Sequence, residues 1–225
     1  MKKFFATVVL IAMCAACQTE ASPTIATLAS PTISPAAPIA SPTPNAQTLA
    51  QILEDMQVET HWLKGVGVDW QSGEPNGKLV PLDDTHCSAF AAAVSVKLGV
   101  YLLRPPEHKT TLLANAQNEW LNARGAQFGW ERVADGAQAQ TFANAGYFVI
   151  ASYKNPNPTK HGHIAVVRPS DKTIAQILEN GPQIIQAGGN NYNSTSLKNG
   201  FAAHPSAFPR NQIQFFAHLV NLALR

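Results

Sequence analysis

The sequence has few cysteines, few charged residues and no long hydrophobic run. Three cysteines in 225 residues are too few for the disulfide framework of a small secreted scaffold. Charged residues make up 13% of the chain and the formal net charge is +2, without the basic excess typical of a nucleic-acid-binding protein. Acidic or basic blocks are also missing, so charge alone indicates no partner. With 45% hydrophobic residues, the composition is that of a folded protein.

Residues 1–17 have the pattern of an export signal. Two lysines precede an apolar stretch from Phe4 to Met13, which is shorter than the ~20 residues that a membrane-spanning helix needs. The end of the stretch resembles the lipobox of bacterial lipoproteins, in which a cysteine after small residues is acylated. Cys17 follows two alanines and is the predicted lipidation site, with Cys14 as the alternative. The resemblance implies an exported lipoprotein that is anchored to a membrane, in the periplasm, on the outer membrane or at the cell surface.

Residues 18–46 are predicted to be a disordered tether. The part from residue 22 to 45 consists almost entirely of Ser, Pro, Thr and Ala and contains six prolines. Such a composition buries too little apolar surface to offset the entropy lost on ordering. Residues 47–225 follow as a single predicted domain, which is long enough to form one core without metals or disulfides.

Within this domain, sequence patterns predict helices first and mostly strands afterwards. Helical periodicity and end signals predict helices over residues 47–63, 85–98, 112–122, 137–145 and 172–178. Apolar, β-rich runs predict strands over residues 147–153, 163–168 and 183–187, and a strand leading into a helical end over 212–223. Residues 65–84 read as loops with one short strand. Asp84 or Thr85 is expected to cap the helix 85–98, and Ser170 the helix 172–178. The expected fold is α+β, with helices packed on an antiparallel sheet.

Cys87 is the one cysteine outside the export segment, and it lies in the first turn of the predicted helix 85–98. The unpaired N–H groups and the positive dipole end of a helix stabilise a thiolate at this place. A thiolate is a competent nucleophile at neutral pH. Because an exported protein meets an oxidising environment, a reactive role for this cysteine is favoured over a purely structural, buried one.

A nucleophilic cysteine needs a base, and His163 is the strongest candidate. It opens the predicted strand 163–168, which would hold the imidazole rigidly. His161 lies two residues earlier and would share the same face, so spacing alone does not separate the two. The base also needs a polar partner that fixes its tautomer. Gln186 on the next strand is the predicted third residue, and the alternatives are Gln183, Asn190 and Asn191.

Two stretches of the chain resemble the NlpC/P60 cell-wall peptidases and their CHAP amidase relatives. The first stretch is Cys87-Ser88-Ala89-Phe90, followed by Gly99-Val100 and Leu103-Arg104-Pro105. In that family a Cys-Ser-Gly-Phe motif opens a helix. The second is Gly162-His163-Ile164-Ala165-Val166-Val167, which resembles the histidine strand of the superfamily. The family's Tyr-x-Trp-Gly-Gly segment before the cysteine has no counterpart here, where Val68-Asp69-Trp70 occupies the region.

The resemblance implies a papain-like α+β fold and a cysteine hydrolase that cleaves amide bonds of peptidoglycan. The bond would be cut by an endopeptidase or an N-acetylmuramoyl-L-alanine amidase. Cys87 corresponds to the family's nucleophile and His163 to its base. Gln186 corresponds loosely to the third position, which is often Glu or Asn in CHAP enzymes. Peptidoglycan is thus the expected partner, together with a membrane that holds the lipid anchor, and no nucleic acid is expected.

Three other functions fit parts of the same pattern. A Cys-His acyl transferase or amidase acting on a protein substrate would use the same catalytic pair. A cell-wall-binding lipoprotein with a degenerate site would keep the fold and lack the chemistry. A zinc site could draw on His86, Cys87, His161 and His163, but no Cys-x-x-Cys pair or carboxylate joins them. We therefore expect neither a metal nor any other cofactor.

Overall fold

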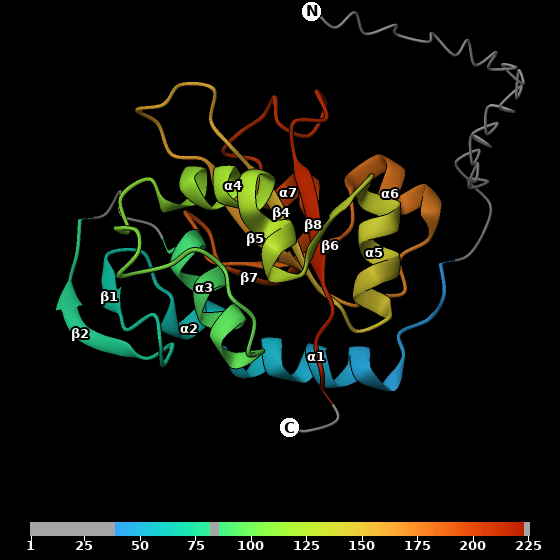
Figure 1. The fold of residues 1–225 in the computed structure, drawn as a ribbon, viewed down its shortest axis with the longest axis horizontal. Helices are drawn as coiled ribbons and strands as arrows, with labels where there is room; N and C mark the ends of the chain where they lie inside the picture. Colours follow the sequence, from blue (N-terminus) through green and yellow to red (C-terminus); the bar gives the residue numbers. More distant parts are fainter. Residues whose placement is uncertain (1–38, 82–85, 223–225) are drawn as a thin grey trace, which may run out of the picture. The chain divides into compact units, whose positions relative to one another are not determined.

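The computed structural model describes residues 39–81 and 86–222. They fold around one six-stranded sheet with helices on both faces (Figure 1). In sheet order the strands are β3 (Trp130–Val133), β8 (Gln214–His218), β4 (Phe148–Tyr153), β5 (His163–Val167), β6 (Gln183–Gln186) and β7 (Tyr192–Ser196). Every neighbouring pair is antiparallel. The expected α+β class, with helices on an antiparallel sheet, is confirmed.

The helices divide between the two faces of the sheet. They are α1 (Pro44–Asp55), α2 (Val58–His61), α3 (Cys87–Lys97), α4 (Leu113–Arg124), α5 (Gly136–Asn144), α6 (Ile174–Asn180) and α7 (Leu197–Gly200). Because alternate strand residues point to opposite faces, β5 contributes to two cores. Ile164 and Val166 share a core cluster with residues of α1, α3 and α4, whereas Ala165 and Val167 share one with α5 and α7.

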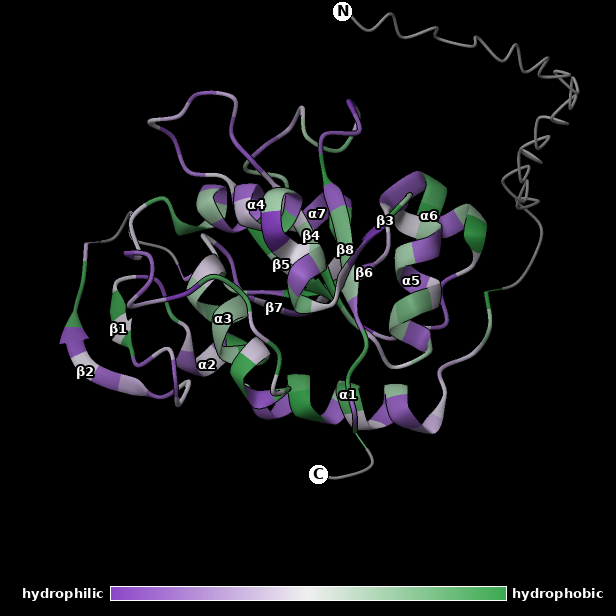
Figure 2. Ribbon diagram, in the orientation of Figure 1, coloured by the Kyte–Doolittle hydropathy of each residue, from purple (hydrophilic) through white to green (hydrophobic). Residues whose placement is uncertain are grey.

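Helix α1 shows how the sequence encodes this layering. Figure 2 shows hydrophobic and hydrophilic stretches alternating along it, and its buried residues include Leu49 and Leu53. Thr43 caps the helix by accepting a hydrogen bond from the backbone N–H of Ala46, and Pro44 occupies the first helical position, where no donor is lost. Gln57 follows in a left-handed conformation, which separates α1 from α2.

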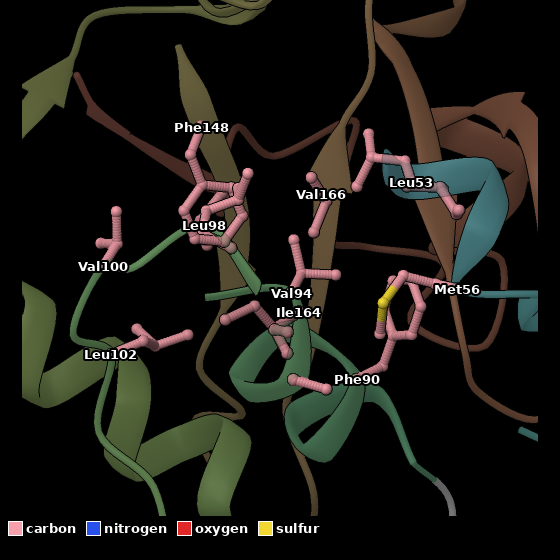
Figure 3. Close-up of a cluster of buried hydrophobic side chains, with 14 of the residues drawn as sticks. Leu53, Met56, Phe90, Val94, Leu98, Val100, Leu102, Phe148, Ile164 and Val166 are labelled. Atoms are coloured by element: carbon pink, nitrogen blue, oxygen red, sulfur yellow. The ribbon is translucent and has the colours of Figure 1, made fainter. Parts of the chain in front are cut away.

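Helix α3 packs on β5 and runs in the same direction (Figure 3). Phe90, near the start of α3, shares a core cluster with Ile164, near the start of β5. Leu98, just after α3, lies beside Phe148 in Figure 3. Phe148 begins β4, which is antiparallel to β5 and so starts at the carboxyl end of β5. The first residues of α3 and β5 therefore lie at the same end of the sheet.

Most of the predicted elements are confirmed. Helices predicted over residues 112–122 and 137–145 correspond to α4 and α5, and the strands over 147–153, 163–168 and 183–187 correspond to β4, β5 and β6. The helix predicted over 47–63 is present as α1 and α2, which are separated at Gln57. The strand in the run 212–223 is β8, but the described residues after it form no helix.

Several boundaries were wrong. The folded part begins before residue 47, because Thr43 caps α1 within the predicted tether 18–46. Thr173, rather than Ser170, caps α6, and Gln176 returns the hydrogen bond to complete a capping box. Residues 65–84 contain two strands, β1 (Val66–Val68) and β2 (Pro75–Leu79), which pair as an antiparallel hairpin.

Other predictions fall where the structure gives no description. The signal peptide 1–17 with Cys14 and Cys17, and the tether up to residue 38, lie outside the described residues. The proposed caps Asp84 and Thr85 also lie outside them, and the cap position of α3 is occupied by His86. Over the described residues, no helix is both long and apolar enough to cross a membrane.

Candidate active site

Cys87 is the first residue of α3, as the sequence predicted for the first turn of this helix. The side chain is buried and belongs to the core cluster on the α3 face of the sheet. The preceding residue, His86, is held by two contacts of its imidazole ring. His86 Nε2 lies 2.7 Å from the carbonyl oxygen of Val66 in β1, and its ring packs edge-on against Trp62. The hairpin is thereby linked directly to the residue before the cysteine.

His163 is the first residue of β5, and its imidazole is bonded to Gln186 on the neighbouring strand. The His163 Nε2 atom lies 2.8 Å from Gln186 Oε1, and both side chains are buried. Because an amide oxygen only accepts hydrogen bonds, Nε2 carries the proton of the neutral ring. This leaves Nδ1 unprotonated, so the Gln186 contact selects the tautomer in which Nδ1 can act as a base.

Gln186 is itself held in place. Its Nε2 donates to the carbonyl oxygen of Asn190 at 3.1 Å, so the amide oxygen is turned toward the imidazole. The three alternative third residues have other contacts. Gln183 donates to the Ser194 hydroxyl. Asn190 contributes its carbonyl to Gln186, and Asn191 ties the β6–β7 turn to α2 through the carbonyl oxygens of Val58 and Trp62.

The environment of His163 favours the uncharged ring. Burial lowers the pKa of His163 from 6.5 to about 4, because an imidazolium is poorly solvated there. The hydrogen bond to Gln186 opposes this and the nearby His204 adds to it. At neutral pH the side chain is therefore a neutral imidazole, which is the form that can accept a proton.

Cys87 and the His163–Gln186 pair lie at the same end of the sheet and contact different core clusters. The His163 ring packs at 4.6 Å against Phe201, a residue of the α5 and α7 core, whereas Cys87 belongs to the α3 core. Gln186, which is hydrogen-bonded to His163, also lies close to Gly200 of α7. Gly162, which precedes His163, lies close to the carbonyl oxygen of Tyr153 and would have no space there for a side chain.

The structure also distinguishes His163 from the other histidines predicted near it. His161 is exposed and lines the pocket described below, and its carbonyl oxygen accepts a hydrogen bond from Asn155. His86 is directed at the Val66 carbonyl. Within residues 39–81 and 86–222, no group of three His, Cys, Asp or Glu side chains is arranged to hold a metal ion.

Several contributing residues were not predicted from the sequence. His204 lies 6.0 Å from His163 between ring centroids, and 4.9 Å from Tyr153. Phe201 covers the imidazole. Gln117 of α4 donates to the carbonyl oxygens of Ser88 and Leu103, and so joins the two separated parts of the cysteine motif. The sequence signal for Gln117 was weak, since a glutamine within a helix is usually exposed.

A pocket of about 250 Å³ adjoins the His163 and Gln186 side chains. It is formed by the start of β5, the turn between β6 and β7, and the segment from α7 to His204. This set of groups provides a thiol at a helix start, an oriented neutral imidazole and a cavity beside it. Such an arrangement is suited to nucleophilic acyl transfer.

No family model matches the chain, and no curated protein matches it either.

Proposed function

We propose that the protein is an exported cysteine hydrolase that cleaves amide bonds of peptidoglycan. The observation that carries the proposal is the His163–Gln186 hydrogen bond of 2.8 Å, which lies at the same end of the sheet as the first residue of the Cys87 helix. A nucleophile, a base and a group that orients the base are the minimum set for this chemistry. A papain-like fold, as implied by the resemblance of the cysteine and histidine motifs, belongs to the same proposal.

In the first half of the reaction, the Cys87 thiol attacks the carbonyl carbon of the amide. The thiol proton passes to Nδ1 of His163 while Sγ forms the bond to carbon. In this mechanism the backbone N–H of Cys87, at the start of the helix, donates to the resulting oxyanion. The carbon–nitrogen bond then breaks, Nδ1 returns the proton to the leaving nitrogen, and a free amine departs from a thioester.

In the second half, water hydrolyses the thioester. Water gives a proton to Nδ1 of His163 and attacks the carbonyl carbon. The carbon–sulfur bond breaks, Sγ recovers the proton, and the acid product leaves. Gln186 holds the ring through Nε2 in both halves, so that Nδ1 can accept and return a proton without a change of tautomer.

Peptidoglycan is proposed as substrate because of the family resemblance and the export pattern. A chain that is acylated at Cys17 and tethered by residues 18–46 would act at the membrane or cell surface, where the cell wall is within reach. An endopeptidase and an N-acetylmuramoyl-L-alanine amidase share the chemistry described above. They differ only in which amide is cut.

The proposal is tested with purified sacculi and mass spectrometry of the released fragments. The wild type should release soluble fragments with new free amines, and Cys87→Ala should release none. Ser95→Ala is the matched control, because it also truncates a buried side chain of α3, two turns further along. The control should keep both activity and thermal stability.

Each remaining outcome has a distinct meaning. Full activity of Cys87→Ala would exclude the thiol mechanism. Release that requires an added amine or protein acceptor would favour an acyl transferase. Binding of the wild type to sacculi without any release would indicate a non-catalytic cell-wall-binding protein.

A further inference from the structure

Gln117 is a polar side chain in the core between α4 and the cysteine helix α3. It lies in the first half of α4 and has no exposed surface. Its Nε2 donates one proton to the carbonyl oxygen of Ser88, at 3.1 Å, and the other to that of Leu103, at 3.0 Å. Ser88 directly follows Cys87, and Leu103 lies in the stretch after α3. A single amide group therefore joins the first turn of α3 to two other segments of the chain.

The oxygen of the same amide is unfavourable for the fold. Gln117 Oε1 is buried and has no hydrogen-bond partner within the part of the chain that the structure describes. A buried acceptor without a partner lowers stability. Gln140 of α5 is equally buried and shows the usual arrangement, because its Oε1 accepts from the backbone N–H of Gln183. Gln117 is thus held only through its two donors, and stability alone does not account for an amide at this position.

The first turn of α3 needs support from outside the helix. His86 occupies the cap position and makes no side-chain capping hydrogen bond, and its ring is directed at the Val66 carbonyl instead. Helix ends fray where their first N–H groups lack partners. Because a carbonyl oxygen has two lone pairs, the Ser88 carbonyl can accept from Gln117 in addition to its donor within the helix. The Gln117 contact therefore restrains the turn that carries Cys87 without competing with the helix.

We propose that Gln117 is a positioning residue for Cys87. By fixing the Ser88 carbonyl, it keeps the thiol at an ordered helix start, where the N–H groups and the helix dipole favour a thiolate. The consequence for catalysis rests on the proposed hydrolase function, whereas the consequence for the reactivity of the thiol does not. The two consequences can be measured separately.

A comparison of Gln117→Met with Gln140→Met tests the proposal in the full chain. Methionine has a similar length and no donor, so each variant removes two hydrogen bonds that a buried amide donates. The rate at which iodoacetamide alkylates Cys87 is measured against pH, by mass spectrometry of the peptide that contains this residue. The midpoint of the profile reports thiolate formation, and the plateau at high pH reports access to the sulfur. Release of fragments from sacculi and unfolding in urea are measured in parallel.

The two variants should behave in opposite ways. In Gln117→Met the midpoint should rise by about half a pH unit, since an ordered helix start is worth roughly this much to an anion. The release rate should fall about tenfold or more because the nucleophile is displaced. Unfolding should stay close to that of the wild type, since the unpaired oxygen is removed together with the donors. Gln140→Met should unfold at lower urea concentration and keep the wild-type midpoint and release rate.

The outcomes separate the positioning role from the hydrolase function. An unchanged midpoint in Gln117→Met, or equal shifts in both variants, would overturn the positioning role. A shift in Gln117→Met alone, with no release from sacculi by the wild type, would overturn the hydrolase function and retain the positioning role.

Hydrogen exchange of the wild type tests the same role without any variant. The backbone N–H of Phe90, in the first turn of α3, donates to the His86 carbonyl at 2.7 Å. If Gln117 restrains this turn, the Phe90 amide should exchange as slowly as amides in the middle of α3. Much faster exchange at Phe90 would show that the turn frays despite Gln117, and would overturn the proposal.

Discussion

At the scale of single residues, two opposing effects set the pKa of His163. Burial makes the ring a weak base, whereas the amide oxygen of Gln186 favours the protonated ring. The balance leaves the pKa of His163 at about 4. A base of this kind is fully unprotonated at neutral pH, and the proton it accepts is easily passed on to a leaving amine.

The pH dependence of catalysis follows from this pKa. Since the base must be unprotonated, kcat/KM of the wild type should fall only near pH 4 on the acid side, rather than near 6.5. Gln186→Glu supplies a carboxylate, which stabilises the imidazolium and should move this decline to higher pH by a unit or more. Gln186→Leu leaves the ring without its orienting partner and should lower kcat/KM about 100-fold, without moving the decline upward. Identical profiles in all three proteins would contradict the assignment of His163 as base.

The same pKa predicts how stability depends on pH. In the unfolded chain His163 binds a proton near pH 6.5, and in the folded protein only near pH 4. The unfolded state therefore binds more protons between these values, so stability falls as the pH is lowered through this window. The pKa difference corresponds to about 3 kcal/mol. Urea unfolding of the wild type and of His163→Phe at pH 7 and pH 4 should show a loss that is smaller in the variant by this amount. Equal losses would contradict the prediction.

At the scale of elements, helix α7 packs directly against the Gln186 side chain. Gly200 ends this short helix, and an ideal Cβ there would be 2.6 Å from Gln186 Oε1 and also too close to Ile184. Gly200→Ala should thus push α7 away from the sheet or displace the amide from His163. We expect a loss of about 1–3 kcal/mol in unfolding free energy and a clear loss of kcat. Gly189→Ala, where a Cβ meets nothing, should leave stability unchanged. Equal stability of the two variants would contradict the predicted contact.

The elements that could be predicted from the sequence were those with a strong local pattern. β4 and β5 are largely apolar runs, β6 contains the apolar pair Ile184-Ile185, and α3, α4 and α5 have clear lengths and ends. β3 and β7 were missed because neither contains an apolar run: β3 reads Trp-Glu-Arg-Val and β7 reads Tyr-Asn-Ser-Thr-Ser. α7 is a single turn and has no periodicity to detect.

The sequence likewise predicted some residues of the site and not others. Cys87 and His163 are marked by their places at the starts of a helix and a strand. The choice of Gln186 among four amides depends on strand pairing, since only the pairing of β5 with β6 brings its side chain within hydrogen-bond distance of His163. Phe201 and His204 reach the imidazole because the chain returns through α7. No local pattern contains that information.

At the scale of the whole molecule, the segment before α1 belongs to the folded domain. Asn144, the last residue of α5, donates its side-chain amide to the carbonyl oxygens of Ala40 and Ser170. Its own carbonyl accepts from the backbone N–H of Thr43. Arg168, after β5, pairs with Glu54 of α1. These contacts fasten α1 and the residues before it to both α5 and the sheet.

Truncation at two positions tests this attachment. A chain that begins at residue 39 keeps the Thr43 cap and the Ala40 contact, so it should unfold at the same urea concentration as the longer chain. A chain that begins at residue 47, the boundary expected from composition, loses both. The lost cap is worth about 1 kcal/mol and an unpaired buried Asn144 amide about 1–3, so the unfolding free energy should fall by about 2–4 kcal/mol. Asn144→Ala in the chain from residue 39 should reproduce part of this loss. If the chains from residues 39 and 47 were equally stable, the domain would begin where the proline-rich composition ends.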